Sequence, residues 1–208
     1  MDNIKPKIIV FDIGGVLLDW RSGLEKVAQA LKETPEKFHE YLSLSLTDLE
    51  IGRLTPEEFW SKTAEVYKYN GSSQDLSSFW TDFQQVIPEG WKLAKDLKNA
   101  GYRIIACSNN WLGVIERQKE SIHDFSIFET IVDSSRVGAK KPEEEIYRVV
   151  EKVTAHSGNE LLLIDDSDKN IEGALNVGWL AHKFDYTVND GNNDAEDIKS
   201  MLLKLKLL

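Results

Sequence analysis

The feature that most constrains the fold is a set of three short, almost wholly apolar runs at residues 8–11, 104–107 and 161–164. Runs of strand length without alternating polar positions are typical of strands buried on both faces, as in a parallel sheet. Weaker strand candidates lie at residues 131–132 and 180–184. Helical patterns separate these segments. This alternation predicts an α/β fold: a doubly wound parallel sheet with a Rossmann-like core.

Three of the intervening segments carry clear helix signals. Residues 91–99 are periodic, and the pattern stops before a glycine at position 101. Residues 142–153 begin with a proline, which suits a first helical turn, and continue with acidic residues, which suit its positive end. Residues 169–177 are followed by Gly178, which predicts a C-cap.

The stretch from residue 21 to 86 breaks the alternation, because it shows helical signals and no convincing strand. Ser22 and Thr55 each begin a capping box, with a glutamate three residues later. Thr34 precedes a proline at the first helical position, and Asn70-Gly71 is a stop signal. We therefore expect four helical segments in this stretch.

The expected organisation is a core of residues 1–20 and 87–208, interrupted by an all-helical cap of residues 21–86. A chain of 208 residues with 41% hydrophobic residues can bury a core of this size. The C-terminal segment IKSMLLKLKLL, residues 198–208, is expected to form a short apolar helix. That helix either docks on the core or forms a dimer contact, so the protein is expected to be a monomer or a homodimer.

Net charge and cysteine content limit the possible partners and the compartment of the protein. The formal net charge of −10 argues against nucleic acid or an anionic membrane as the partner, since both need basic patches. No apolar run approaches the length of a membrane helix, and the N-terminus lacks a signal-peptide core. The single cysteine, Cys107, suits a reducing compartment and is expected to be a buried core thiol. These observations predict a cytoplasmic protein.

Polar residues stand where the predicted strands end. Asp12 ends the first, Ser108 and Asn109 end the second, and Asp165-Asp166 end the third, while Lys141 precedes a helix after the weaker strand at residue 131. Ligands bind beyond the carboxyl ends of parallel strands, so these side chains should converge on one edge. Clustered carboxylates repel one another unless a cation lies among them, and oxygen ligands favour Mg²⁺.

Four segments carry a resemblance to a known family. They read VFDIGGVL, IIACSNN, GAKKPEEEIY and LLLIDDSDKN, in this order along the chain. With the helical segment between the first two, the chain resembles the haloacid dehalogenase superfamily of phosphatases and related hydrolases, up to about His182. The resemblance implies a Mg²⁺-dependent phosphatase that hydrolyses a small phosphorylated metabolite, such as a sugar phosphate or a nucleotide monophosphate.

The resemblance also implies roles at the matching positions. Asp12 would attack phosphorus and form an aspartyl-phosphate, and Lys141 would neutralise charge on Asp12 and the phosphate. The metal ligands would be Asp12, the backbone carbonyl of Gly14, Asp166 directly, and Asp165 in support. Asn170 stands where the family often has another acid, and it could orient a metal-bound water.

A second group of residues is implied on the substrate side. Ser108 would donate its hydroxyl to a phosphoryl oxygen, with help from Asn109 and its neighbour Asn110. Gly15 would allow a tight turn and bring its amide near the phosphate. Trp20 and Trp111 follow the first two motifs and either line a substrate cavity or pack in the core or hinge.

One family residue is missing. Most of the family's phosphatases have an aspartate two places after the nucleophile, where it protonates the leaving group and activates water, and here that place is Gly14. A general acid or base is worth ~10²–10⁴ in rate, so its loss should slow the reaction rather than abolish it. Glu50, Asp48 and His39 are candidates for a substitute in the cap.

Two other functions remain open from the sequence. A 2-haloacid dehalogenase would use Asp12 against carbon, without a metal and without an acid at position 14. Its family branch, however, has small neutral residues where Asp165-Asp166 stand here. The other alternative is a catalytically degenerate member that binds a phosphorylated ligand or a partner protein.

Overall fold

A computed structural model describes residues 6–121, 125–185 and 200 of the chain. Its main sheet has five parallel strands in the order β5-β4-β1-β6-β7. Their bounds are β1 Ile8–Phe11, β4 Arg103–Ser108, β5 Ile131–Asp133, β6 Leu161–Asp165 and β7 Leu180–Lys183. The predicted doubly wound α/β fold is confirmed.

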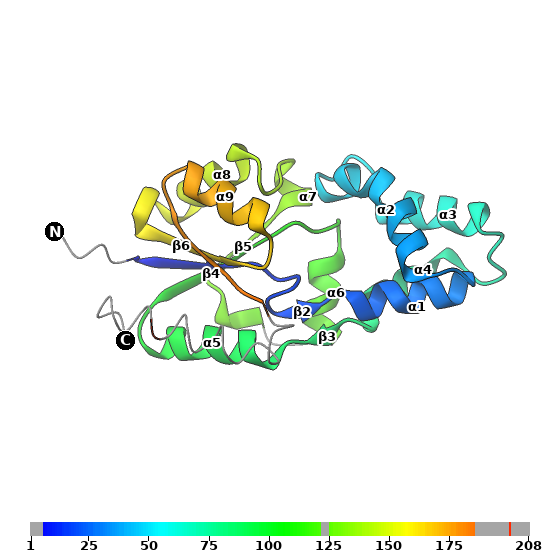
Figure 1. Ribbon diagram of the computed structural model, residues 1–208, viewed down its shortest axis with the longest axis horizontal. Helices are drawn as coiled ribbons and strands as arrows, with labels where there is room; N and C mark the ends of the chain where they lie inside the picture. The colour runs from blue at the N-terminus through cyan, green and yellow to red at the C-terminus, as the bar shows by residue number, and fades with distance from the viewer. Residues whose placement is uncertain (1–5, 122–124, 186–199, 201–208) are drawn as a thin grey trace.

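Helices cover both faces of this sheet, which explains the continuous apolar runs (Figure 1). Alternate residues of β1 enter two separate hydrophobic clusters: Ile9 and Phe11 pack with α5 (Pro88–Asn99), and Ile8 and Val10 pack with α8 (Glu144–Thr154). The helix α9 (Asp168–Asn176) also lies on the α8 side, through Ala174. Burial of both sides of a strand leaves no position for an alternating polar residue.

Further short elements join these helices. They are α6 (Val114–Ser121), α7 (Ser134–Val137), and the 3₁₀ helices η1 (Phe125–Ile127) and η2 (Gly158–Glu160). The predicted start of α8 at Pro142 is wrong, because the helix begins at Glu144. Residues 140–143 form a turn closed by a hydrogen bond from the Glu143 N–H to the Lys140 carbonyl at 2.8 Å, and Glu143 has the extended backbone of an N-cap residue, so the helix starts only after it.

The expected four helical segments follow β1. They are α1 (Arg21–Leu31), α2 (Pro35–Glu50), α3 (Pro56–Val66) and α4 (Ser73–Asp82). Figure 1 shows them together at one end of the molecule, beyond the carboxyl ends of the strands. They share a hydrophobic cluster that also takes in Trp111 and Val114 from the other part of the chain. The domain boundaries at residues 20 and 86 stay a prediction.

The observed helix N-caps can be compared with those predicted from the sequence. Thr34 and Thr55 cap α2 and α3 as predicted, and Thr55 forms its capping box with Glu58. The cap predicted at Ser22 is wrong, because α1 begins at Arg21 without a side-chain cap from its N-cap residue. The Arg21 amide is instead satisfied by Asp19 Oδ1 at 2.9 Å, so this helix start does not depend on a serine.

A two-stranded ribbon was missed in the sequence. The four helices α1–α4 form what we call the helical section. The strands β2 (Leu18–Asp19) and β3 (Gln85–Val86) pair antiparallel where the chain enters and leaves it. Two-residue strands carry too little pattern to be recognised from periodicity. The Trp91 indole donates to the Leu17 carbonyl at 3.1 Å, which ties this ribbon to α5.

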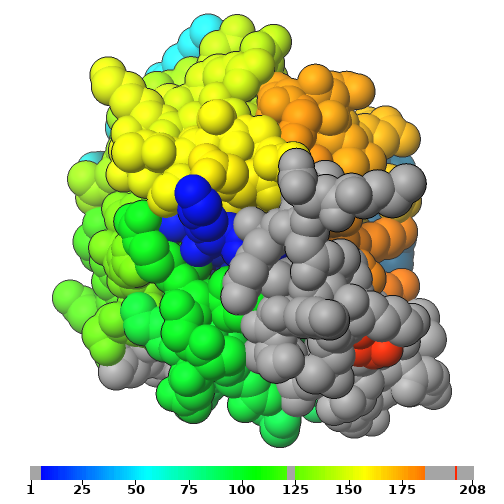
Figure 2. Space-filling view, turned by 90° about the vertical axis from the view of Figure 1, so that its left-hand side faces the viewer, coloured from blue at the N-terminus to red at the C-terminus, as the bar shows by residue number. Residues whose placement is uncertain are grey.

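Figure 2 views the end of the molecule opposite the four helices, where the start of β1 lies between segments of α8 and α5. The strands therefore begin at this end and run toward the helical section. The predicted C-terminal helix of residues 198–208 lies outside the described residues, apart from Ser200. No helix in the described part of the chain combines the length and apolarity needed to cross a membrane.

Candidate active site

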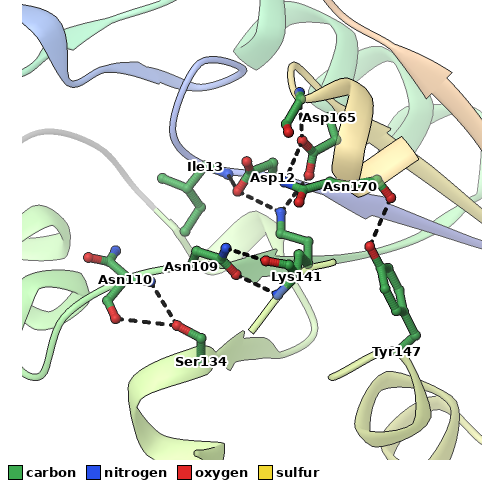
Figure 3. A network of polar contacts seen from close by, with 10 residues as sticks. Asp12, Ile13, Asn109, Asn110, Ser134, Lys141, Tyr147, Asp165 and Asn170 are labelled. Atoms are coloured by element: carbon green, nitrogen blue, oxygen red, sulfur yellow. Dashed lines mark hydrogen bonds and ion pairs between the residues drawn. The ribbon is translucent and has the colours of Figure 1, made fainter. Parts of the chain in front are cut away.

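The carboxyl ends of β1, β4 and β6 meet at a cavity of about 290 Å³ that the helical section covers. Residues from both parts of the chain line it, including Asp12, Gly14, Ser108, Asn109 and Asp166 on the sheet side. The predicted convergence of strand-end residues on one edge is therefore present in the structure (Figure 3).

Asp12 is oriented through one of its two carboxylate oxygens. Its Oδ1 accepts a hydrogen bond from the Ile13 backbone N–H at 2.7 Å and lies 3.0 Å from Lys141 Nζ. No described residue donates to Oδ2. One oxygen thus holds the carboxylate in place, while the other is left for chemistry at the cavity.

Lys141 is buried between two carboxylates. Its Nζ lies 2.6 Å from Asp165 Oδ2, and its side chain has no exposed surface. Attraction to Asp12 and Asp165 outweighs the opposing effect of burial, so the pKa of Lys141 is raised and the ammonium stays charged. Asn109 fixes the lysine backbone: its Nδ2 donates to the Lys141 carbonyl and its Oδ1 accepts from the Lys141 N–H (Figure 3).

The two adjacent aspartates have different surroundings. Asp165 is fully engaged: one oxygen binds Lys141, and the other accepts from the Ser167 N–H and from Asn170 Nδ2, each at 2.9 Å. Asp166 has no side-chain hydrogen bond to another described residue and lines the cavity. Asp166 therefore offers free oxygens, while Asp165 positions Lys141.

Gly15 makes this placement of Asp166 possible. Its φ of +77° suits glycine, and a Cβ at this position would lie 2.1 Å from Asp166 Oδ2. The Gly15 N–H, which the resemblance places near a phosphate, donates to the Leu18 carbonyl at 2.8 Å in this structure, and its role toward a phosphate stays a prediction. Gly15 therefore contributes to the site because, without a Cβ, it leaves room for the Asp166 carboxylate.

The cluster can hold a metal ion. Asp12, Asp165 and Asp166 each offer a ligand atom, and these atoms lie within 4.8 Å of one another. With every group ionised, Lys141 leaves an excess of two negative charges. Burial, then the neighbouring aspartates, raise the pKa of Asp12 to about 8 against the opposing effect of Lys141, and burial and Asp165 raise that of Asp166 to about 6. A divalent cation fits this donor set and would keep the carboxylates ionised.

Ser108 and Asn110 line the cavity with Asp12 on the β4 side. Ser108 Oγ has no hydrogen-bond partner among the described residues and lines the cavity, so it can donate to a bound ligand. Asn110 also lines the cavity, where its Oδ1 accepts from the Trp111 N–H at 2.8 Å. The side chain of Asn109 is used instead to hold Lys141, which makes it a positioning residue in this geometry.

Both tryptophans singled out in the sequence line the cavity and also pack with the helical section. Trp20 stacks with His39 at a ring-centroid distance of 6.0 Å. Trp111 stacks with Trp80 of α4 at 4.7 Å and an interplanar angle of 6°. Packing and cavity lining are therefore compatible roles for each of them.

Two of the three candidates for the missing acid lie at the cavity, and the third does not. Glu50 and His39 line the cavity with Asp12, whereas Asp48 does not and forms only an exposed ion pair with Arg53. Glu50 Oε2 lies 2.8 Å from Lys140 Nζ, and burial raises the pKa of Glu50 against the effect of that lysine.

Trp80, Gln84 and Gln118 are among the cavity residues that sequence reasoning missed. Gln84 lies between α4 and β3, and Gln118 lies on α6, so no motif or spacing brings them together in the sequence. Cys107, in contrast, is buried as predicted, and burial raises the pKa of its thiol to about 12.

Comparison with known proteins defines the class. Residues 6–178 match the family of haloacid dehalogenase-like hydrolases, and the chain therefore belongs to this family. This confirms the resemblance read from the four motifs. A sesquiterpene phosphatase of Aspergillus oryzae is 24% identical over 176 residues, which cover 84% of this chain and 87% of the relative.

Solved structures share the fold. A haloacid dehalogenase family enzyme from Bacteroides thetaiotaomicron, in complex with magnesium and inorganic phosphate, has a TM-score of 0.71 at 23% identity, covering 86% of this chain and 93% of that one. The L-2-haloacid dehalogenase of Xanthobacter autotrophicus has a TM-score of 0.67 at 18% identity, covering 93% and 83%. Because a phosphate-binding enzyme and a dehalogenase share the fold, the choice between them depends on the site.

Proposed function

We propose that the chain is a Mg²⁺-dependent phosphatase that hydrolyses a small phosphorylated metabolite through a phosphorylated Asp12. The observation that carries this proposal is the buried cluster: one ammonium among three carboxylates, with Asp12 Oδ2 and Ser108 Oγ both available at the cavity. The name of the Aspergillus relative and the magnesium and phosphate in the Bacteroides structure support it.

In the first half-reaction, Asp12 Oδ2 forms a bond to phosphorus as the bond from phosphorus to the substrate's alcohol oxygen breaks. Lys141 balances charge on Asp12, and Ser108 donates a hydrogen bond to a phosphoryl oxygen. The leaving oxygen takes up a proton. Water then attacks phosphorus, which releases inorganic phosphate and regenerates the Asp12 carboxylate.

The metal would be held by Asp12, Asp166 and the carbonyl of Gly14, with Asp165 supporting it through Lys141 and Asn170. When bound, Mg²⁺ supplies positive charge that lets an anionic carboxylate meet an anionic phosphoryl group. Gly15 leaves room for Asp166 to approach this position, and Gly14 lines the cavity.

The surroundings of Asp12 favour a phosphatase over a dehalogenase. Two further carboxylates beside the nucleophile would repel a halocarboxylate, whereas with a divalent cation they form a site for a phosphate ester. The source of the proton for the leaving group is Glu50 or His39 if it comes from the cap, since both line the cavity.

Hydrolysis of p-nitrophenyl phosphate tests the proposal. We expect turnover with Mg²⁺, loss of turnover with EDTA, and recovery when Mg²⁺ is restored. Asp12→Asn should be inactive, and acid quench with labelled substrate should trap phosphate on the wild type only. The exposed Asp48→Asn provides the matched control. Turnover by Asp12→Asn, or turnover that ignores chelation, would contradict the proposal.

A further inference from the structure

A row of three buried amides runs along the cavity from the β4 loop to the end of the cap. The Trp111 backbone N–H donates to Asn110 Oδ1 at 2.8 Å. Asn110 Nδ2 lies 3.5 Å from Gln118 Oε1, and Gln118 Nε2 donates to Gln84 Oε1 at 2.8 Å. Asn110, Gln118 and Gln84 are each at least nine-tenths buried, and all three line the cavity.

The backbone at the start of the row determines the orientation of every amide in it. A backbone N–H can only donate, so Asn110 must present its oxygen to Trp111 and its nitrogen to Gln118. Gln118 must then present its nitrogen to Gln84 Oε1. Gln84 Nε2 has no partner among the described residues, so the row ends in a hydrogen-bond donor at the cavity.

The cap side of the cavity is largely apolar, and His39 and Glu50 are the polar side chains that it adds to the amide row. Leu42, Leu46, Trp20 and Trp80 form much of its cap side. No lysine or arginine is among the described residues that line the cavity, and the Glu50 carboxylate is already paired with Lys140 at 2.8 Å. A second phosphate or a carboxylate on the leaving group would therefore find no lysine or arginine partner on the described cavity wall, and burying it there unpaired would be costly.

The cavity volume sets a size limit. At about 290 Å³ the cavity lies just below the ~300–1,000 Å³ typical of ligand sites. The many hydroxyls of a sugar would find few partners on its apolar wall, and each unpaired one would cost free energy of desolvation.

We propose that the preferred substrates carry one phosphate on an uncharged, mainly apolar alcohol with a hydrogen-bond acceptor, and that Gln84 is the specificity-determining residue that binds this acceptor. This inference rests on the proposed phosphatase function. Gln118 and Asn110 are positioning residues, because they act through the orientation of Gln84.

Three aryl phosphates of similar size test the substrate class. Para-acetylphenyl phosphate has the acceptor, para-isopropylphenyl phosphate lacks it, and para-carboxyphenyl phosphate adds an anion. We expect wild type to prefer the first and to discriminate against the third. If no ester is hydrolysed, or hydrolysis persists in Asp12→Asn, the phosphatase function itself is refuted. If hydrolysis needs Asp12 but the carboxylated ester is preferred, only the substrate inference fails.

Substitution of Gln84 tests the donor. Gln84→Met should lower kcat/KM for the acetyl ester about fivefold relative to the isopropyl ester, mainly through KM, as expected for one neutral hydrogen bond. The ratio between two esters cancels any general loss from altered packing. Gln85→Met, at the exposed neighbouring position, is the control and should leave the ratio unchanged. An unchanged ratio in Gln84→Met would overturn the role of Gln84.

A charge placed on the apolar wall gives an independent test. Leu46→Lys should shift the kcat/KM ratio about tenfold toward the carboxyphenyl ester, because an ammonium would then face the carboxylate. Leu44→Lys is the matched control, since Leu44 lies on the same helix with 82% of its surface exposed. Equal ratios in the two variants would show that the leaving group does not contact this wall.

Discussion

The pair Gly14 and Gly15 offers a sharp test of how the acidic site is built. A Cβ at position 15 would lie 2.1 Å from Asp166 Oδ2, at a φ of +77°. A Cβ at position 14 would meet only Trp20 Cδ1, at 3.5 Å, and Gly14 is not among the residues of positive φ. Gly15→Ala should therefore disrupt the site, whereas Gly14→Ala should leave it nearly intact.

The expected magnitude follows from these distances. An ordinary contact begins near 3.4 Å, so Asp166 must retreat by about 1.3 Å to accept the new methyl group. A misplacement of about 1 Å can cost ~10²-fold in rate. The left-handed backbone adds about 1–2 kcal/mol of strain for alanine, which should appear as a lower free energy of unfolding.

Two measurements check this expectation. Turnover of p-nitrophenyl phosphate over a Mg²⁺ titration should show ~10²-fold lower kcat/KM and weaker Mg²⁺ dependence for Gly15→Ala, with little change for Gly14→Ala. Urea unfolding should show a loss of about 1–2 kcal/mol for Gly15→Ala alone. Equal activity and equal Mg²⁺ response in the two variants would refute the assigned role of Asp166.

Three further predictions concern the same site. Gly14→Asp should raise kcat for alkyl phosphates by ~10²–10⁴ and change p-nitrophenyl phosphate much less, because that leaving group needs little protonation; an equal gain on both would argue against a missing acid. Lys141→Met leaves buried carboxylates unpaired, so it should abolish turnover and lower the free energy of unfolding by about 3–5 kcal/mol in urea; a loss below about 1 kcal/mol would contradict the pairing. Without metal, the folded protein retains on Asp12 a proton that the unfolded chain releases, since the pKa is raised from 3.8 to about 8. Stability should therefore fall as pH rises between about 4 and 8, by up to about 1.4 kcal/mol per pH unit, and Asp12→Asn should reduce this slope.

The sequence by itself determined the sheet, the helical section and the family. A strand that is covered on both faces needs an apolar residue at nearly every position, so its burial can be recognised from the sequence alone. The strand ends then placed Asp12, Ser108 and Asp166 at one edge, because parallel strands end on the same side. The local cap signals at Thr34 and Thr55 were also readable, since each threonine and the backbone N–H that it caps lie within one turn.

Only the tertiary structure decided which site residues face the cavity and which hold other residues in position. Asn109 holds Lys141 across 32 positions of sequence, and Gln118 orients Gln84 across 34. Such pairs depend on the order of strands and on how the helical section lies over them, and no short-range periodicity encodes either. The same holds for Asp165 and Asp166, whose adjacent side chains differ because one meets Lys141 while the other faces the cavity.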